Sequence, residues 1–280
     1  MKGINHLVLA ARDMDALRQR YERLGFTLTP RAQHPFGTGN SVAQLHGSYL
    51  ELLSVTQPQN VPDHAGDAFS FAAFNRDFLA RHEGFSMLVL DTQDAQLDRA
   101  RWAQAGLRTY APFEFSRMAK KANGEEVRVG FALAFTSHPD APWLGLFSCQ
   151  HFAPDYFEQE EYLRHANGAT GIADVWISGD GALELAGWLE TVTGARAVAE
   201  GTCKMLALRT GRIVLASPDE FAAAFGVQPP NARSGPHLAG YTVACRSLAF
   251  FDGMGLERIG ERLVVSPEDA FGTAMAFRSS

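Results

Sequence analysis

The sequence predicts an α+β protein built from βαβββ modules, because a strand and a helix recur along the chain at a fixed offset. Residues 3–9 read GINHLVL and residues 84–90 read GFSMLVL, so the second copy lies 81 positions after the first. The offset continues without a gap: Asp13 corresponds to Asp94, and further along Gly25 corresponds to Gly106. Such a repeat indicates two modules of one design.

Two more copies extend the prediction to four modules. The third begins at Gly171 with GIADVWI, and a weaker fourth begins near Gly240 with GYTVACR. Four starts over 280 residues leave room in each module for one strand, one helix and about three further strands.

Each opening strand is followed by a segment with apolar residues at helical spacing. In the first two modules a glycine near the end of the segment supplies the usual left-handed stop. The expected helices cover residues 14–26, 95–107, 182–194 and, in the weakest copy, 247–256.

The remaining strands are apolar runs separated by turn residues. In the second module the dipeptide Asn123-Gly124 separates two such runs and predicts a hairpin. The expected strands are 41–47, 48–55, 114–120, 126–135, 142–152, 203–210, 211–218, 261–267 and 272–278.

Connectors join the modules. The first contains a probable helix within residues 67–84, where Phe71, Phe74 and Phe78 share one face. This stripe either packs on the sheet or covers a cavity. Residues 152–170 and 218–239 are further connectors.

Composition and charge limit the function classes. Apolar residues make up 46% and charged residues 20%, which permits a sizeable core, and 20 phenylalanines fit either that core or an aromatic pocket. The net charge of −6 disfavours nucleic acid and anionic membrane as partners. We expect no membrane span, and three widely separated cysteines without a CxxC fit the reducing cytoplasm.

The repeated unit resembles the vicinal-oxygen-chelate superfamily, which includes glyoxalase I and the bleomycin-resistance proteins. The resemblance is sharpest in GINHLVLAARDMDAL and in YLELLSV, and HPFGTGN followed by YLELLSV is similar to the glyoxalase-like domain proteins. It implies that modules pair into two curled mixed sheets. It therefore divides the chain into an N-terminal pair, residues 1–155, with the active cup, and a degenerate C-terminal pair, residues 156–280.

In this superfamily the cup binds a divalent metal through residues on the first and last strand of each module. The resemblance places His6 and Glu51 at two of these positions. The third is Met87, a poor ligand for a hard ion. The fourth falls within Ser148–His151, where Gln150 or His151 would contact the metal or the substrate.

The implied function is a glyoxalase-like lyase or isomerase that chelates two oxygens of a small α-oxygenated substrate on Zn, Ni, Mn or Fe. His6 and Glu51 would be the metal ligands, and Glu51 would also be the catalytic base. The alternative is a non-catalytic protein of the bleomycin-resistance type that binds or sequesters a small molecule, which the methionine at position 87 favours. A homodimer is one assembly that the resemblance allows.

Three further residues are candidate substrate contacts. His34 and Asn40 lie in the loop QHPFGTGN, which suits either a ligand-binding loop or a plain hairpin turn. Arg117 either holds a substrate carboxylate or is a solvated strand charge.

The C-terminal pair has no comparable residue set. The matching positions there are Asp174, about Val214 and Val243, which cannot supply the triad of extradiol dioxygenases. Iron-dependent ring cleavage is therefore disfavoured.

Overall fold

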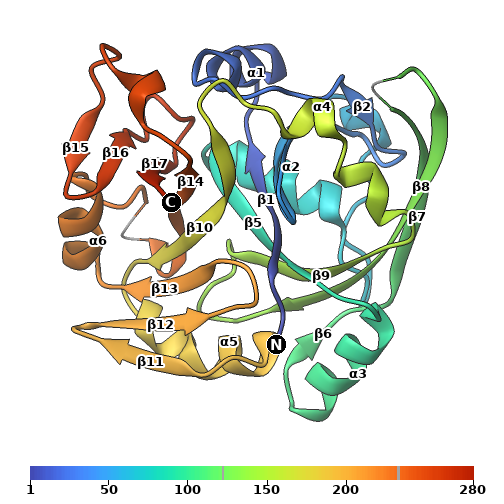
Figure 1. Ribbon diagram of the computed structural model, residues 1–280. Helices are drawn as coiled ribbons and strands as arrows, with labels where there is room; N and C mark the ends of the chain where they lie inside the picture. The colour runs from blue at the N-terminus through green and yellow to red at the C-terminus, as the bar shows by residue number, and fades with distance from the viewer. Residues whose placement is uncertain (122, 232–233) are drawn as a thin grey trace.

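The computed structural model describes residues 1–121, 123–231 and 234–280. It contains two mixed sheets, one of nine strands and one of eight, with helices at their faces and edges (Figure 1). The first sheet is formed by residues 4–151 and the second by residues 169–279. This confirms the α+β class and the pairing of modules, although neither sheet is strongly curled.

The first two modules give the first sheet. Its strand order is β2-β3-β4-β1-β5-β9-β8-β6, and β7 pairs with β8. In chain order the elements are β1 (Ile4–Ala10), α1 (Met14–Arg23), β2 (Ala32–Gln33), β3 (Thr38–Leu45), β4 (Ser48–Val55), α2 (Phe71–Arg81), β5 (Gly84–Asp91), α3 (Ala95–Gln104), β6 (Arg108–Thr109), β7 (Phe113–Lys120), β8 (Glu126–Ser137) and β9 (Gly145–His151).

The last two modules give the second sheet, in the order β11-β12-β13-β10-β14-β17-β16-β15. The elements are α4 (Glu160–Leu163), β10 (Ala169–Ser178), α5 (Ala186–Thr193), β11 (Ala197–Glu200), β12 (Cys203–Ala207), β13 (Arg212–Ala216), α6 (Pro218–Phe225), β14 (His237–Cys245), β15 (Glu257–Ile259), β16 (Arg262–Val265) and β17 (Ala274–Ser279).

Local chemistry explains why the first two modules start alike. Asp13 and Asp94 both cap a helix, since their carboxylates accept backbone N–H groups of the first turn of α1 and α3. After each helix the chain turns through a left-handed glycine, Gly25 at φ +85° and Gly106 at +80°. The residues matched by the offset of 81 therefore have the same structural roles.

The helix prediction was wrong in two places. Residues 247–256 contain only a short 3₁₀ turn, Ala249–Phe251, so the fourth module has no α-helix. The connector after β13 contains α6, which was not predicted. Ser217 caps this helix in a capping box with Glu220, and Pro218 occupies its first turn.

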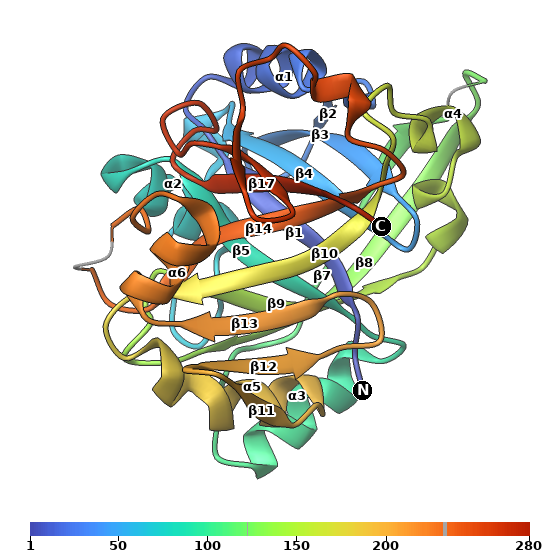
Figure 2. The same cartoon turned by 60° about the vertical axis from the view of Figure 1, so that its left-hand side comes forward.

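The main core lies between the two sheets (Figure 2). It joins Leu7 and Leu9 of β1 to Val175 and Ile177 of β10. The opposite face of the first sheet carries a second apolar cluster, which α2 covers. No helix in the described ranges is long and apolar enough to cross a membrane.

Candidate functional site

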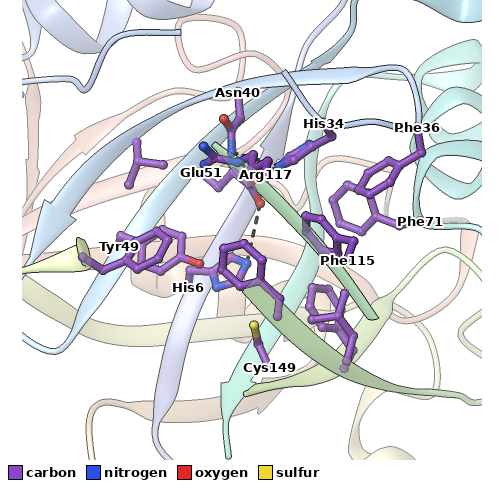
Figure 3. Close-up of a pocket in the computed structure, with 15 residues that line it drawn as sticks. His6, His34, Phe36, Asn40, Tyr49, Glu51, Phe71, Phe115, Arg117 and Cys149 are labelled. Atoms are coloured by element: carbon purple, nitrogen blue, oxygen red, sulfur yellow. Dashed lines mark hydrogen bonds and ion pairs between the residues drawn. The ribbon is translucent and has the colours of Figure 1, made fainter. Parts of the chain in front are cut away.

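A cavity lies on the face of the first sheet that is turned away from the second sheet. Side chains of β1, β3, β4, β7, β8 and β9 line it together with residues of α2 and of the connector after β9. It encloses about 450 Å³ of empty space, its open mouth included. Five residues singled out from the sequence meet here: His6, His34, Asn40, Glu51 and Arg117 (Figure 3).

Strand alternation directs Glu51 into this cavity. Along β4, Leu50 and Leu52 belong to the core between the sheets, so Tyr49 and Glu51 face the other way. The Glu51 side chain is only 6% exposed. Asn40 Nδ2 donates a hydrogen bond of 2.5 Å to its Oε1. No lysine or arginine in the described residues forms an ion pair with this carboxylate.

This environment raises the pKa of Glu51 to about 7. Burial is the largest cause, and the hydrogen bond from Asn40 and the positive charge of Arg117 oppose it. Near neutral pH the carboxyl group is therefore close to half ionised. A carboxyl group poised in this way can both accept and return a proton.

His6 is held in one tautomer by its neighbour in sequence. Asn5 Oδ1 lies 2.6 Å from Nδ1 of His6 and 3.1 Å from Nε2 of His151. A carbonyl oxygen only accepts, so both imidazole nitrogens must donate to it. Nε2 of His6 then carries no proton and has a lone pair that can accept a hydrogen bond. This atom lies 3.6 Å from Glu51 Oε2.

His6 is buried and neutral. Burial lowers its pKa well below the usual value, and the nearby His151 and His34 lower it further. The imidazole stacks on Tyr49, with ring centroids 4.3 Å apart and an interplanar angle of 12°. The ring is therefore fixed in both orientation and protonation.

His34 combines the two interpretations of its loop. It lies in the turn between β2 and β3, as a plain hairpin would have it, yet its side chain reaches the cavity. Its Nδ1 lies 2.8 Å from Thr38 Oγ1, and its Nε2 lies 3.7 Å from Glu51 Oε1. Burial, followed by the charge of Arg117, lowers the pKa of His34 to about 3, so it too is neutral.

Arg117 reaches the cavity from β7. Its Nε atom is buried and has no hydrogen-bond partner among the residues that the structure describes. Within the described ranges its guanidinium makes a single long contact of 3.5 Å, from Nη1 to the carbonyl oxygen of Met118. Most of its donors are therefore available to a ligand.

Gln150 and His151 lie outside the lining of this cavity, contrary to the prediction from the sequence. The side chain of Gln150 instead accepts the backbone N–H of Ala95 at the start of α3. Strand pairing gives the reason: Val8 pairs with Glu51, and its counterpart Val89 pairs with Phe147. Phe147 is thus the match of Glu51, and the predicted register was wrong by at least one residue.

The donor set does not fit a tightly held divalent ion. Of the four expected ligand positions, only those of His6 and Glu51 have side chains that can bind a hard metal ion, since the other two positions are Met87 and Phe147. No group of three or more His, Cys, Asp or Glu within the described ranges could hold a metal. Besides His6 and His34, the neighbours of Glu51 are the Asn40 amide N–H and the Arg117 guanidinium, which are hydrogen-bond donors whose positive ends disfavour a nearby cation.

The many phenylalanines allowed an aromatic pocket as one alternative, but the sequence did not show which of them line it. Rings come from segments that are far apart in sequence, and they surround the polar residues: Phe36, Phe71, Phe115, Phe131, Phe147 and Phe157. The helical stripe in α2 did predict one of them, because Phe71 is the member of that stripe that reaches the cavity. Asn5 was also missed, and no sequence signal identifies it.

A family model described as a glyoxalase-like domain matches residues 4–193, more than half of the chain. The chain belongs to the glyoxalase-like domain family. The resemblance stated from the sequence is thereby confirmed. No curated protein matches the sequence.

Two solved structures share the fold of this glyoxalase-like protein at low identity, and a third matches only part of the chain. A hypothetical protein from Staphylococcus aureus matches over 100% of both chains, with 13% identity and a TM-score of 0.73. A mutant of 4-hydroxymandelate synthase from Streptomyces coelicolor matches over 99% of this chain and 92% of its own, with 12% identity and a TM-score of 0.56. Methylmalonyl-CoA epimerase from Mycobacterium tuberculosis covers 53% of this chain and 87% of its own, with 15% identity and a TM-score of 0.36.

Proposed function

We propose that this protein is an isomerase or lyase that moves a proton at the carbon next to a carbonyl group of a small α-oxygenated substrate. Glu51 is the proposed base. The observation that supports this most is a buried carboxyl group with a pKa of about 7, facing a cavity and paired with no cation of the described residues. A base with a pKa near the working pH is the most effective at this task.

The residues around Glu51 position the base and stabilise the enolate. The ionised carboxylate takes the proton, the C–H bond breaks, and its electron pair moves into the carbonyl group to give an enolate. Asn40 fixes Oε1 through its N–H, and the lone pair on His6 Nε2 lies near Oε2 as a neighbouring acceptor for the captured proton. The guanidinium of Arg117 stabilises the negative oxygen of the enolate. The proton then returns to the same carbon. If that carbon bears a hydroxyl group, the hydroxyl proton first moves to the enolate oxygen, and the carboxyl proton then goes to the former carbonyl carbon, which gives the isomeric hydroxy-carbonyl compound.

A metal-assisted form would require His6 and Glu51 to hold a divalent ion with ligands from water or substrate. Two protein ligands are fewer than the three that catalytic zinc sites use. We therefore expect elemental mass spectrometry to find no near-stoichiometric zinc, nickel, manganese or iron after supplementation. A stoichiometric metal that is lost in a His6→Ala/Glu51→Ala variant would overturn the metal-free form.

Deuterium incorporation tests the proposed base. NMR would follow exchange at the carbon next to the carbonyl group for a panel of small 2-oxo acids and α-hydroxyketones in D₂O. We expect the wild-type protein to accelerate exchange of at least one compound and Glu51→Gln to lose the acceleration. Arg128→Met is the matched control. Arg128 is an exposed cation on the adjacent strand β8, its guanidinium donates hydrogen bonds to Ser116 Oγ, and it lies outside the cavity lining.

The second candidate is a non-catalytic protein that binds or sequesters a small molecule. The aromatic lining and the loss of donors at Met87 and Phe147 favour it. If no compound exchanges faster with the wild-type protein than with Glu51→Gln, the proton-transfer function is wrong. Equal binding of panel compounds to both proteins would then support the second candidate.

A further inference from the structure

The cavity has a polar part and an aromatic part. In Figure 3 the side chains of Asn40, Glu51 and His34 lie together, and Phe36, Phe71 and Phe115 lie beside them. Six phenylalanine rings and Tyr49 line the cavity, along with aliphatic side chains such as Leu133. A ligand that fills this space therefore needs a polar head and an apolar body.

The rings around the apolar part favour a flat body. Phe36 meets Phe71 at a centroid distance of 5.7 Å and 66°, and it meets Phe115 at 5.1 Å and 80°. These are edge-to-face contacts, the arrangement that aromatic rings prefer. Another planar ring can join such a cluster with the same geometry. A hydroxyl-rich or phosphorylated body would lose water without gaining partners there.

Arg117 determines the charge of the head. It is the one lysine or arginine among the described residues that line the cavity, and no carboxylate in the described part of the chain forms an ion pair with it. A buried guanidinium N–H without an acceptor costs free energy, so the free Nε indicates an acceptor that a ligand supplies. A planar carboxylate matches the guanidinium fork, and one cation balances one negative charge.

Resting on the proposed function, we propose that the substrate is an aryl-substituted monocarboxylic acid whose carboxylate binds Arg117 and whose ring packs among the phenylalanines. A carbonyl group in the same molecule, next to the carbon that loses its proton, would place that carbon near Glu51. An aryl 2-oxo acid combines these features. Its carbonyl oxygen is next to the carboxylate, so the one guanidinium of Arg117 can bind the carboxylate and also stabilise the enolate oxygen.

Four probes separate the two recognition elements in calorimetric titrations of the full chain: phenylacetate, cyclohexylacetate, propanoate and phenylacetamide. We expect phenylacetate to bind most tightly, because it has both the flat ring and the charge. Propanoate lacks the ring and phenylacetamide lacks the charge, so each should bind about tenfold more weakly. Cyclohexylacetate keeps the size and loses the flat shape, and it should fall between them.

The matched variants locate the charge effect. In Arg117→Met the preference for phenylacetate over phenylacetamide should fall to near one, whereas Arg128→Met should keep the wild-type preference. Equal binding of phenylacetate and phenylacetamide to the wild-type protein would overturn the proposal, as would equal binding of phenylacetate and propanoate. An unchanged preference in Arg117→Met would also overturn it.

Failure of this proposal can be told apart from failure of the proton-transfer function. Glu51→Gln should still prefer phenylacetate over phenylacetamide, because Arg117 and not Glu51 is the carboxylate anchor. If phenylacetate binds with the expected pattern but phenylpyruvate shows no catalysed deuterium exchange, the ligand class stands and the function is wrong. If only short aliphatic 2-oxo acids exchange, the function stands and the aryl class is wrong.

Discussion

The two sheets have the same strand order, but the buried acid of each sheet, which lies at a different position in each, has opposite surroundings. In the second sheet Asp174 occupies the position of His6. It lies 3.4 Å from Arg212 and 3.6 Å from Arg262, and it accepts a hydrogen bond of 2.7 Å from Trp176. In the first sheet Glu51 has only neutral hydrogen-bonding neighbours within such distances.

The helices that cover the outer faces of the two sheets also pack differently. In the second half, Phe221 and Phe225 of α6 pack on Trp176, whose counterpart in the first sheet is Val8. At the matching position α2 of the first half supplies Phe71 to the cavity wall and leaves room beside it. A buried acid that is paired with cations is costly to remove, because the cations then lose their partner, whereas an acid left unpaired beside an open space is available for chemistry.

The largest expected effect is on catalysis. Glu51→Gln should lower the rate of deuterium exchange by about 10³-fold, because a positioned base contributes roughly 10²–10⁴. Asp174→Asn should leave the rate per folded molecule unchanged, since Asp174 belongs to the other sheet. NMR exchange rates, normalised to folded protein, test both variants. Equal losses in the two variants would mean that Glu51 has no special role.

The next largest effect is on the free energy of unfolding, and here Asp174→Asn should have the larger effect and Glu51→Gln the smaller. Asp174→Asn should lower the free energy of unfolding by about 3 kcal/mol, because it leaves Arg212 and Arg262 without their buried partner. Glu51→Gln keeps the shape of the side chain and the hydrogen bond from Asn40, so it should not destabilise the fold at neutral pH. Urea unfolding measures both. A stable Asp174→Asn variant would show that the ion-pair network contributes little.

The pattern in the sequence could predict much of this comparison. The offset of 81 and the alternation along β4 placed His6 and Glu51 correctly on one face, and Val214 was correctly matched to Glu51. Val243 was mismatched, because strand pairing places Gly240 opposite Trp176 as Met87 lies opposite Val8. Bulges in these strands shift the register, and one residue of shift reverses the face.

The rest of the site depends on tertiary packing. Phe71 and Phe115 line the same cavity although they come from α2 and β7, and no local sequence pattern predicts this arrangement. The raised pKa of Glu51 has the same origin, since its main cause is burial by distant segments. By contrast, α6 could have been predicted from the sequence, because Ser217 and Glu220 have the spacing of a capping box.

The pH dependence of stability should also distinguish the two acids. The pKa of Glu51 is raised on folding, from 4.5 to about 7, so its contribution is fully present below pH 4.5 and is lost as the pH rises through 7. The lowered pKa values of His6 and His34 act in the opposite direction, since their contribution is lost as the pH falls below 6.5. The informative quantity is therefore the difference between wild type and Glu51→Gln.

Between pH 5 and pH 8 this difference should change by about 2 kcal/mol, with the variant gaining on the wild type as the pH rises. Urea unfolding at both pH values tests it, and Asp174→Asn provides the comparison for an acid in an ion-pair network. A difference that stays constant with pH would show that Glu51 keeps an ordinary pKa in the folded protein.

The smallest expected effect concerns the tautomer of His6. In the wild-type protein, long-range ¹H–¹⁵N NMR correlations should show the proton on Nδ1, where Asn5 Oδ1 accepts it. Asn5→Ala removes this acceptor, so the proton can move to Nε2 and donate to Glu51. The lost hydrogen bond is worth about 1 kcal/mol, and the exchange rate should fall less than tenfold.

His34 is the internal control for this experiment. Its Nδ1 is held by Thr38 rather than by Asn5, so its ¹⁵N shifts should stay unchanged in Asn5→Ala. If the wild-type His6 already carries its proton on Nε2, that nitrogen donates to Glu51 and stabilises the ionised carboxylate. The carboxyl group of Glu51 would then accept a hydrogen bond from a ring N–H, as that of Asp174 does from Trp176, and the contrast between the two sheets would narrow.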